Sequence, residues 1–186
     1  MFEELLSRIG ASLDKRSLPY MIIGGQAVLL HGAPRLTRDI DIALGVNTDH
    51  LDELLSVLQE LSLKPIPKDI ESFVRQTMVL PALDGTTGIR IDFIFSFTPY
   101  ETEAIARAEK VTLLDQEVKF ASPEDLIIHK IFAGRPRDIE DVRTIILKNP
   151  EMDIQYIRGW LKGFDAASDE KSYLKTFEGV WKEVES

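Results

Sequence analysis

The chain has 186 residues, 44% hydrophobic and 28% charged, which is typical of one compact globular domain or of a catalytic core with a small helical appendage. Because it has no cysteine, disulfides, thiolate zinc sites and cysteine nucleophiles are excluded, and any metal must be held mainly by oxygen ligands. The absence of an apolar run of about 18 residues and of a signal peptide predicts a cytoplasmic protein with no membrane partner, and the net charge of −9 argues against a protein that coats nucleic acid.

The first half of the chain alternates helices and strands. Apolar residues at helical spacing predict an amphipathic helix at the N-terminus and another over 51–61. The run 20–23 predicts a short strand that stops at Gly24 and Gly25, after which a brief helix runs to His31. The alternation D-I-D-I-A-L over 39–44 predicts a strand with two carboxylates on one face.

The second half predicts more strands and then only helices. The segments 73–80 and 88–97 read as strands, and VTLL-DQ-EVKF reads as a hairpin that turns at Asp115 and Gln116. Helices are predicted over 122–132 and 137–148, followed by two amphipathic stripes. The expected fold is therefore α+β, with a mixed sheet flanked by helices in a core over 1–120 and a C-terminal helical region over 121–186.

Glycines and carboxylates provide the candidate chemistry. A strand that runs through Gly24 and Gly25 into a helix brings backbone N–H groups close to a bound anion. Asp39 and Asp41 are two residues apart, about 6.6 Å along a strand, and face the same way. Asp92 lies on a separate predicted strand, and if the two strands are neighbours the three carboxylates converge. Three carboxylates can hold two Mg²⁺ ions, which support in-line displacement at phosphorus.

These residues also form a pattern that resembles a known family. The stretch IIGGQAVLLHGAPRLTRDIDIAL with the later RIDFIF is similar to the DNA polymerase beta type nucleotidyltransferase superfamily, with its glycine turn, D-x-D and third Asp. More narrowly, G-G-x-A-x-x-x-H-G followed by R-x-T-R-D-I-D, and the later PEDLIIHKIFAGRPRDIEDVR, resemble the AbiEii-like nucleotidyltransferases of type IV toxin-antitoxin systems. The resemblance covers roughly residues 18 to 148.

The resemblance implies transfer of a nucleoside monophosphate from an NTP to an acceptor hydroxyl or phosphate. The acceptor would be RNA, such as transfer RNA, or a small molecule, and an antitoxin protein is an implied partner. Two Mg²⁺ ions, or Mn²⁺ in their place, would be the cofactors. By matching position, the phosphate-binding residues would be Gly24, Gly25, Gln26, Arg35, Arg38 and Lys130. Asp138 or Asp141 would orient the second motif.

Two other functions stay open at this stage. Gln26 stands where the wider superfamily often has Ser or Thr, so the expected hydroxyl contact to phosphate is missing. This departure motivates the alternative of a catalytically idle nucleotide-binding module, or a regulatory or antitoxin-side module, on the same fold. The D-I-D motif would also suit a sugar-nucleotide glycosyltransferase, but the short chain and the upstream Gly-Gly argue against that class.

Overall fold

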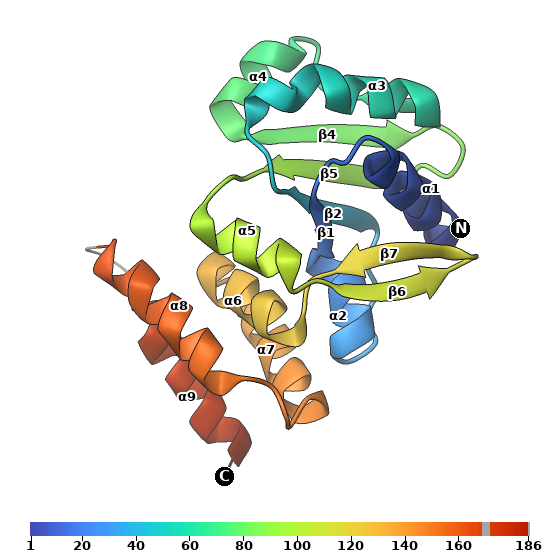
Figure 1. The fold of residues 1–186 in the computed structure, drawn as a ribbon. Coiled ribbons are helices and arrows are strands. Elements are labelled where there is room, and N and C mark those ends of the chain that lie inside the picture. Colours follow the sequence, from blue (N-terminus) through green and yellow to red (C-terminus); the bar gives the residue numbers. More distant parts are fainter. Residues whose placement is uncertain (169–171, 186) are drawn as a thin grey trace. The chain divides into compact units, whose positions relative to one another are not determined.

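The computed structural model describes residues 1–168 and 172–185, which form helices and strands in an α+β arrangement (Figure 1). In chain order the elements are α1 (Phe2–Lys15), β1 (Tyr20–Ile23), α2 (Gly24–His31), β2 (Asp39–Leu44), the 3-10 helix η1 (Thr48–His50), α3 (Leu51–Leu61), β3 (Leu63–Pro65), α4 (Ile70–Thr77), β4 (Val79–Asp84), β5 (Arg90–Phe95), α5 (Pro99–Ala106), β6 (Glu109–Leu113), β7 (Gln116–Phe120), α6 (Pro123–Ala133), α7 (Pro136–Lys148), α8 (Ile154–Ala166) and α9 (Tyr173–Glu185). None of the described helices has the length and apolar character needed to cross a bilayer.

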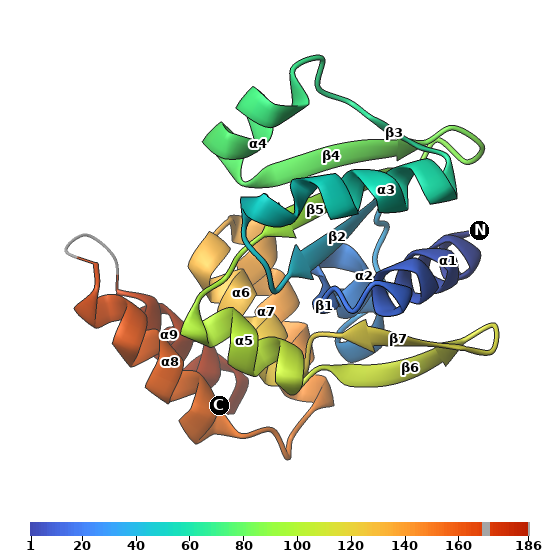
Figure 2. The ribbon, with the colours of Figure 1, turned by 45° about the horizontal axis from the view of Figure 1, so that its top comes forward.

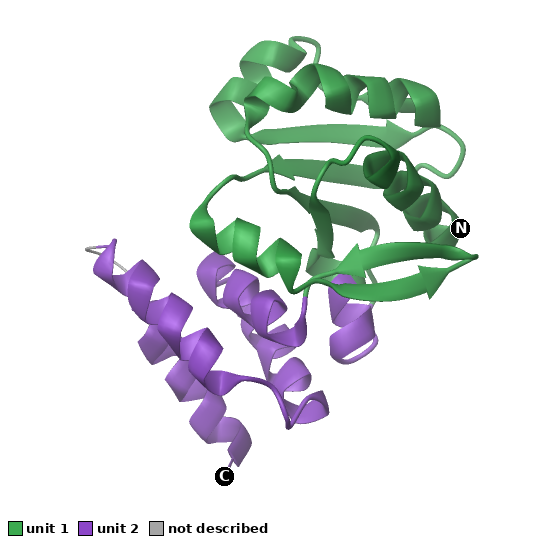
Figure 3. Ribbon diagram, viewed as in Figure 1, with its two compact units in different colours: residues 1–26, 36–121 green, residues 27–35, 122–186 purple. Residues whose placement is uncertain are grey.

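The chain divides into two compact units, as Figure 3 shows. Buried apolar residues lie in each of them. The sheet unit contains Met1–Gln26 and Leu36–Ala121, and the helical unit contains Ala27–Arg35 and Ser122–Ser186. Helix α2 therefore starts in the sheet unit, and its later residues belong with the C-terminal helices.

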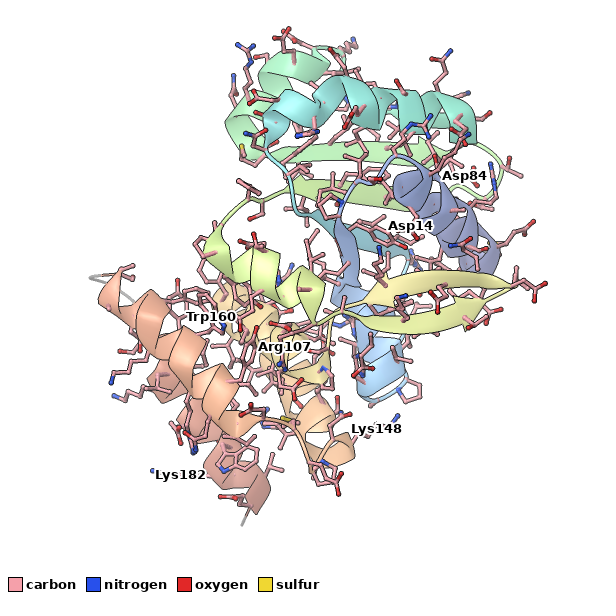
Figure 4. The ribbon with its side chains drawn as sticks, viewed as in Figure 1. Asp14, Asp84, Arg107, Lys148, Trp160 and Lys182 are labelled. Carbon is pink, nitrogen blue, oxygen red and sulfur yellow. The ribbon has the colours of Figure 1, made fainter. Side chains whose placement is uncertain are left out.

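The sheet unit is built on seven strands in the order β3-β4-β5-β2-β1-β7-β6. Strands β2 and β5 are parallel neighbours at its centre, and β1 runs antiparallel to β2. Helices α1 and α3 pack side by side, as Figures 1 and 2 show, and α1 also packs on β7. Asp14 near the end of α1, labelled in Figure 4, accepts a 2.7 Å hydrogen bond from Lys119 on β7. The mixed sheet flanked by helices, with helices at the C-terminal end, confirms the predicted fold class.

The helical unit is stapled by ion pairs and aromatic contacts. Arg158 on α8 donates two hydrogen bonds to Glu178 on α9, with the shorter at 2.6 Å. Arg143 on α7 reaches Glu183 on α9 at 2.7 Å. The apolar faces of these helices follow the stripes predicted from the sequence, and Leu161 and Phe177 are fully buried.

Two local predictions are wrong. The segment 73–80 was expected to be a strand, but its first part is α4, because the side chain of Asp69 caps the helix by accepting from the backbone N–H of Ser72 at 3.1 Å. Helix α4 ends at Met78 in the left-handed conformation, and β4 starts only at Val79. The hairpin is present, but it turns at Leu114 and Asp115, both with positive φ, one residue earlier than predicted. Strand β3 was not predicted, because three residues are too few to show a period.

Candidate active site

Asp41 and Asp92 are direct partners on neighbouring strands. The parallel register of β2 and β5 pairs Asp41 with Asp92 and Asp39 with Arg90. Partners in a parallel ladder face the same side of the sheet, and residues two apart on a strand do so too. Ile40 and Ile91, which face the other side, are fully buried. The expectation that the two strands are adjacent is confirmed, and the three carboxylates share one face of the sheet.

Arg90 lies on the same face as these carboxylates. Its Nε donates a 2.9 Å hydrogen bond to Oδ1 of Asp92, and its side chain is 53% exposed. This hydrogen bond, followed by the charges of Asp92, Asp39 and Asp41, raises the pKa of Arg90 above its already high usual value. The guanidinium of Arg90 therefore interacts electrostatically with all three carboxylates. As they are placed, no three His, Cys, Asp or Glu side chains among the described residues form a group that could hold a metal ion.

Gly24 lies against the carboxylate of Asp41. Ile23, the last residue of β1, is paired with Asp41, so the chain enters α2 directly beside that side chain. Gly24 has φ +63°, and a Cβ added there would lie 1.9 Å from Oδ2 of Asp41. Both the backbone conformation and the packing exclude a side chain at this position. The glycine turn and the carboxylate strand thus form one local structure.

Gln26 follows the two glycines in the first turn of α2. The residue is 7% exposed, and its Nε2 is buried without a hydrogen-bond acceptor among the described residues. A buried donor left without an acceptor costs on the order of 1–3 kcal/mol. An anion at the start of α2 is one group that could supply the missing acceptor.

Lys130 and Arg35 belong to the helical unit, where both pair with aspartates. The Nζ of Lys130, on α6, lies 2.9 Å from Asp138 Oδ1 and 2.9 Å from Asp141 Oδ2, and all three side chains are at most 6% exposed. Arg35 Nε lies 3.1 Å from the other oxygen of Asp141. Arg38, by contrast, is exposed, and no described residue makes a polar contact with it.

Asp138 also accepts a hydrogen bond from Arg135, whose Nε donates to Oδ2 at 2.6 Å. Burial, the largest single influence, raises the pKa of Asp138, but the hydrogen bonds from Arg135 and Lys130 and their charges together outweigh it. The net effect lowers the pKa of Asp138 below its usual value. Asp138 is therefore held as a carboxylate between two cations.

Reasoning from the sequence missed two of these features. Arg90 was not named as a site residue, although its position two residues before Asp92 on a strand places it on the carboxylate face. The bridge that Asp141 makes between Lys130 and Arg35 joins residues far apart in the chain, and no sequence spacing indicates it.

A groove in the sheet unit lies away from these residues. It is formed by η1, α3 and α4, with Leu51, Leu55, Ile70 and Val74 among its lining residues. None of the candidate site residues lines it. We give the groove no part in the chemistry, because its lining lacks the paired carboxylates of β2 and β5.

Comparison with known proteins bears on this arrangement. The profile of a family described as nucleotidyltransferases of unknown function (DUF6036) matches residues 1–186. No curated protein sequence matches the chain significantly.

Solved structures resemble the fold at low sequence identity. The antibiotic-resistance factor ANT(2'')-Ia matches with a TM-score of 0.59 and 20% identity, over 89% of this chain and 93% of that one. A nucleotidyltransferase-like protein of Paracoccidioides brasiliensis gives 0.55 and 20%, over 94% and 92%. The lincosamide antibiotic adenylyltransferase LnuA, with lincomycin bound, gives 0.53 and 15%, over 76% and 94%. At this identity the likeness shows the fold alone.

Proposed function

Because the chain belongs to a family of nucleotidyltransferases, we propose that it transfers a nucleoside monophosphate from an NTP to an acceptor, with Asp39, Asp41 and Asp92 as its catalytic, metal-binding carboxylates. The observation that carries the proposal is the register of β2 and β5, which sets Asp41 beside Asp92 on the face next to Gly24. We propose that residues 1–120 form the nucleotidyltransferase core and that residues 121–186 form the helical region. We also propose that the protein acts in the cytoplasm.

The three carboxylates supply the oxygen ligands that Mg²⁺, or Mn²⁺ as a substitute, prefers. To share an ion they would have to move closer together, because as placed among the described residues they form no group that could hold one. The negative charges of all three carboxylates stabilise the positive charge of Arg90. A cation is therefore the ligand class that this face attracts. Bound metal would polarise the phosphates and lower the pKa of the acceptor hydroxyl. For the ion to reach Asp92, the exposed side chain of Arg90 swings away, which costs little because surface ion pairs are weak.

The phosphates would bind at the start of α2. Gly24 and Gly25 let the backbone approach an anion closely, and the helix N-terminus favours negative charge. The unsatisfied amide of Gln26 would donate to a phosphate oxygen in place of the hydroxyl that the wider superfamily often has there. For Arg35, Arg38 and Lys130 we propose phosphate contacts only on the ground that the resemblance implies them.

The acceptor is a small molecule or an RNA end. Solved structures of the same fold contain adenylyl-2''-tobramycin, a small molecule that already carries an adenylyl group, or the small molecule lincomycin. The net charge of −9 also favours a small or cationic acceptor over a polyanion. Transfer RNA is the second acceptor class. The AbiEii-like motifs imply it, together with a toxin role and an antitoxin partner.

The test is transfer of label from each α-labelled NTP with Mg²⁺ to tobramycin, lincomycin or total transfer RNA. Asp41→Asn should abolish transfer, because it removes the carboxylate beside Gly24. Asp115→Asn at the tip of the β6–β7 hairpin should leave it unchanged, since Asn tolerates the positive φ of that turn. Equal transfer by wild type and Asp41→Asn would refute the assignment.

An idle nucleotide-binding module is the competing function, because Gln26 lacks the usual hydroxyl. It predicts that the wild-type protein binds NTP without transferring label to any acceptor. Gln26→Ser restores the hydroxyl and separates the two functions. If transfer appears only in this variant, the natural protein is a binding module.

A further inference from the structure

Helix α7 holds the chain segment that leads from α2 toward β2. The backbone N–H of Ala33 donates to Oγ1 of Thr144 at 3.2 Å, and the side chain of Asn149 donates to the carbonyl of His31 at 2.9 Å. Gly32 packs so closely that a Cβ there would lie 2.8 Å from Oγ1 of Thr144. The backbone just before Arg35 is therefore fixed against α7.

Asp141 extends this hold to the side chain of Arg35. One of its oxygens lies 3.1 Å from Arg35 Nε, and the other lies 2.9 Å from Lys130 Nζ. The Nε of Arg35 and Oδ2 of Asp141 are buried, yet neither makes an aligned hydrogen bond, so these contacts are ion pairs without directional bonding. Asp141 thus bridges two cations that come from different parts of the chain.

Arg35 uses only one edge of its guanidinium in this bridge. Within the described residues, its two terminal amino groups have no acceptor, although the side chain is only 20% exposed. The surrounding cluster also has more cations than anions, because Arg35, Lys130 and Arg135 face Asp138 and Asp141. An incoming anion is the partner that this charge excess favours.

We propose that Asp141 is a positioning residue, which holds Arg35 by its Nε edge so that the terminal amino groups are presented to a phosphate group. This inference rests on the proposed function and assigns to Asp141 a role through Arg35. A guanidinium suits the task because its planar fork donates two parallel hydrogen bonds to one oxyanion. Holding the fork in advance lowers the entropy lost when the anion binds.

Inorganic tripolyphosphate is the probe, with its affinity measured by titration calorimetry. Loss of a charge-assisted contact weakens binding by about tenfold. We expect this loss in Asp141→Asn and in Arg35→Lys, whose single ammonium cannot pair with Asp141 and also present a fork. The double variant should bind no more weakly than Arg35→Lys alone, because Asp141 acts only through Arg35.

Asp138→Asn is the matched control, because Asp138 also pairs with buried Lys130 but makes no polar contact with Arg35 within the described part of the chain. It should bind tripolyphosphate within about twofold of wild type. A second readout is the side-chain Nε–H resonance of Arg35 in nitrogen-resolved NMR spectra. It should shift and broaden in Asp141→Asn and stay in place in Asp138→Asn. If Asp141→Asn does not fold, Arg35→Lys, at a partly exposed position, still tests whether the guanidinium fork binds tripolyphosphate.

Three results would overturn the proposal: equal losses in Asp138→Asn and Asp141→Asn, additive losses in the double variant, or no tripolyphosphate binding by wild type. Failure of the proposed function gives a different result. In that case tripolyphosphate binds and depends on Asp141, but no NTP is transferred to any acceptor.

Discussion

The carboxylates of β2 and β5 and those of α7 differ in what surrounds them. On the sheet, Asp39, Asp41 and Asp92 share one face, and their three charges stabilise the charge of a single guanidinium, that of Arg90. In the helical unit, Asp138 and Asp141 are buried and lie among three cations. The first group has an excess of negative charge, and the second an excess of positive charge.

This difference separates carboxylates that water can solvate from carboxylates whose ion pairs also support the fold. Buried aspartates without counter-ions would cost several kcal/mol each, so the pairs of Lys130 are needed for folding. The carboxylates on the sheet are exposed or partly exposed, so water can solvate them. We therefore expect substitutions on the sheet face to affect function, and substitutions around Lys130 to affect stability first.

The largest expected effect is on stability, from Lys130→Met. This substitution leaves Asp138 and Asp141 buried without their shared cation, so the free energy of unfolding should fall by about 3–5 kcal/mol in urea denaturation. Arg135→Gln is the control, because the Arg135 side chain is 74% exposed and Lys130 still pairs with Asp138. It should cost less than about 1 kcal/mol. Equal stability of the two variants would mean that the buried ion pairs of Lys130 do not support the fold.

Gly24→Ala should have the next largest effect. Its positive φ and the contact with Asp41 together should cost about 1–3 kcal/mol of unfolding free energy. Gly88→Ala is matched, since Gly88 has φ +71° but nothing within 4 Å of an added Cβ, so the difference between the two isolates the contact with Asp41. Combining Gly24→Ala with Asp41→Ala should recover part of that difference. Equal costs in the two glycine variants would argue against the contact.

Acid should weaken the helical unit through Asp138, with a smaller effect. The pKa of Asp138 is lowered in the folded protein, so its contribution to stability is present above the unfolded pKa of about 3.8. That contribution is lost as the pH falls through the lower, folded-state pKa. In melting curves from pH 6 to pH 2.5, wild type should lose stability below about pH 4 more steeply than Asp138→Asn. Parallel curves would contradict the lowered pKa.

Arg90→Gln should give the smallest effect, on metal affinity. The pair with Asp92 is partly exposed and contributes at most about 1 kcal/mol, so its removal should tighten Mn²⁺ binding by no more than about fivefold. Calorimetric titration with Mn²⁺ in the absence of nucleotide measures this. Arg75→Gln, which breaks an exposed pair on α4, is the control and should leave Mn²⁺ affinity unchanged. Weaker binding in Arg90→Gln would mean that Arg90 does not compete with the cation.

Much of the sheet could be predicted because its signals are local. The alternation in D-I-D-I-A-L and G-I-R-I-D-F fixed which side chains share a face, and only the adjacency of β2 and β5 had to be assumed. Helix α4 was missed because its amphipathic face buries little more than Val74, so the apolar residues around it read equally well as a strand.

The site could be predicted only where one element holds its residues. The positions of Asp39, Asp41 and Asp92 followed from strand period, but the close packing of Asp41 on Gly24 depends on how β1 enters α2. Lys130 was expected to contact a triphosphate, and its two aspartate partners come from a different helix. The pairing of side chains from two helices does not follow from the period of either helix. The roles of these residues in binding stay predictions until the variants are measured.

The ion pair between Arg90 and Asp92 also bears on whether the strands can pair before any metal binds. A strand pair that carries three acidic groups on one face would repel itself if it had to wait for a metal before closing. With Arg90 two residues from Asp92, the newly made chain brings its own positive charge to that face. If the carboxylates bind magnesium as proposed, folding would therefore not need to wait for the ion, because Arg90 already offsets part of the negative charge on this face.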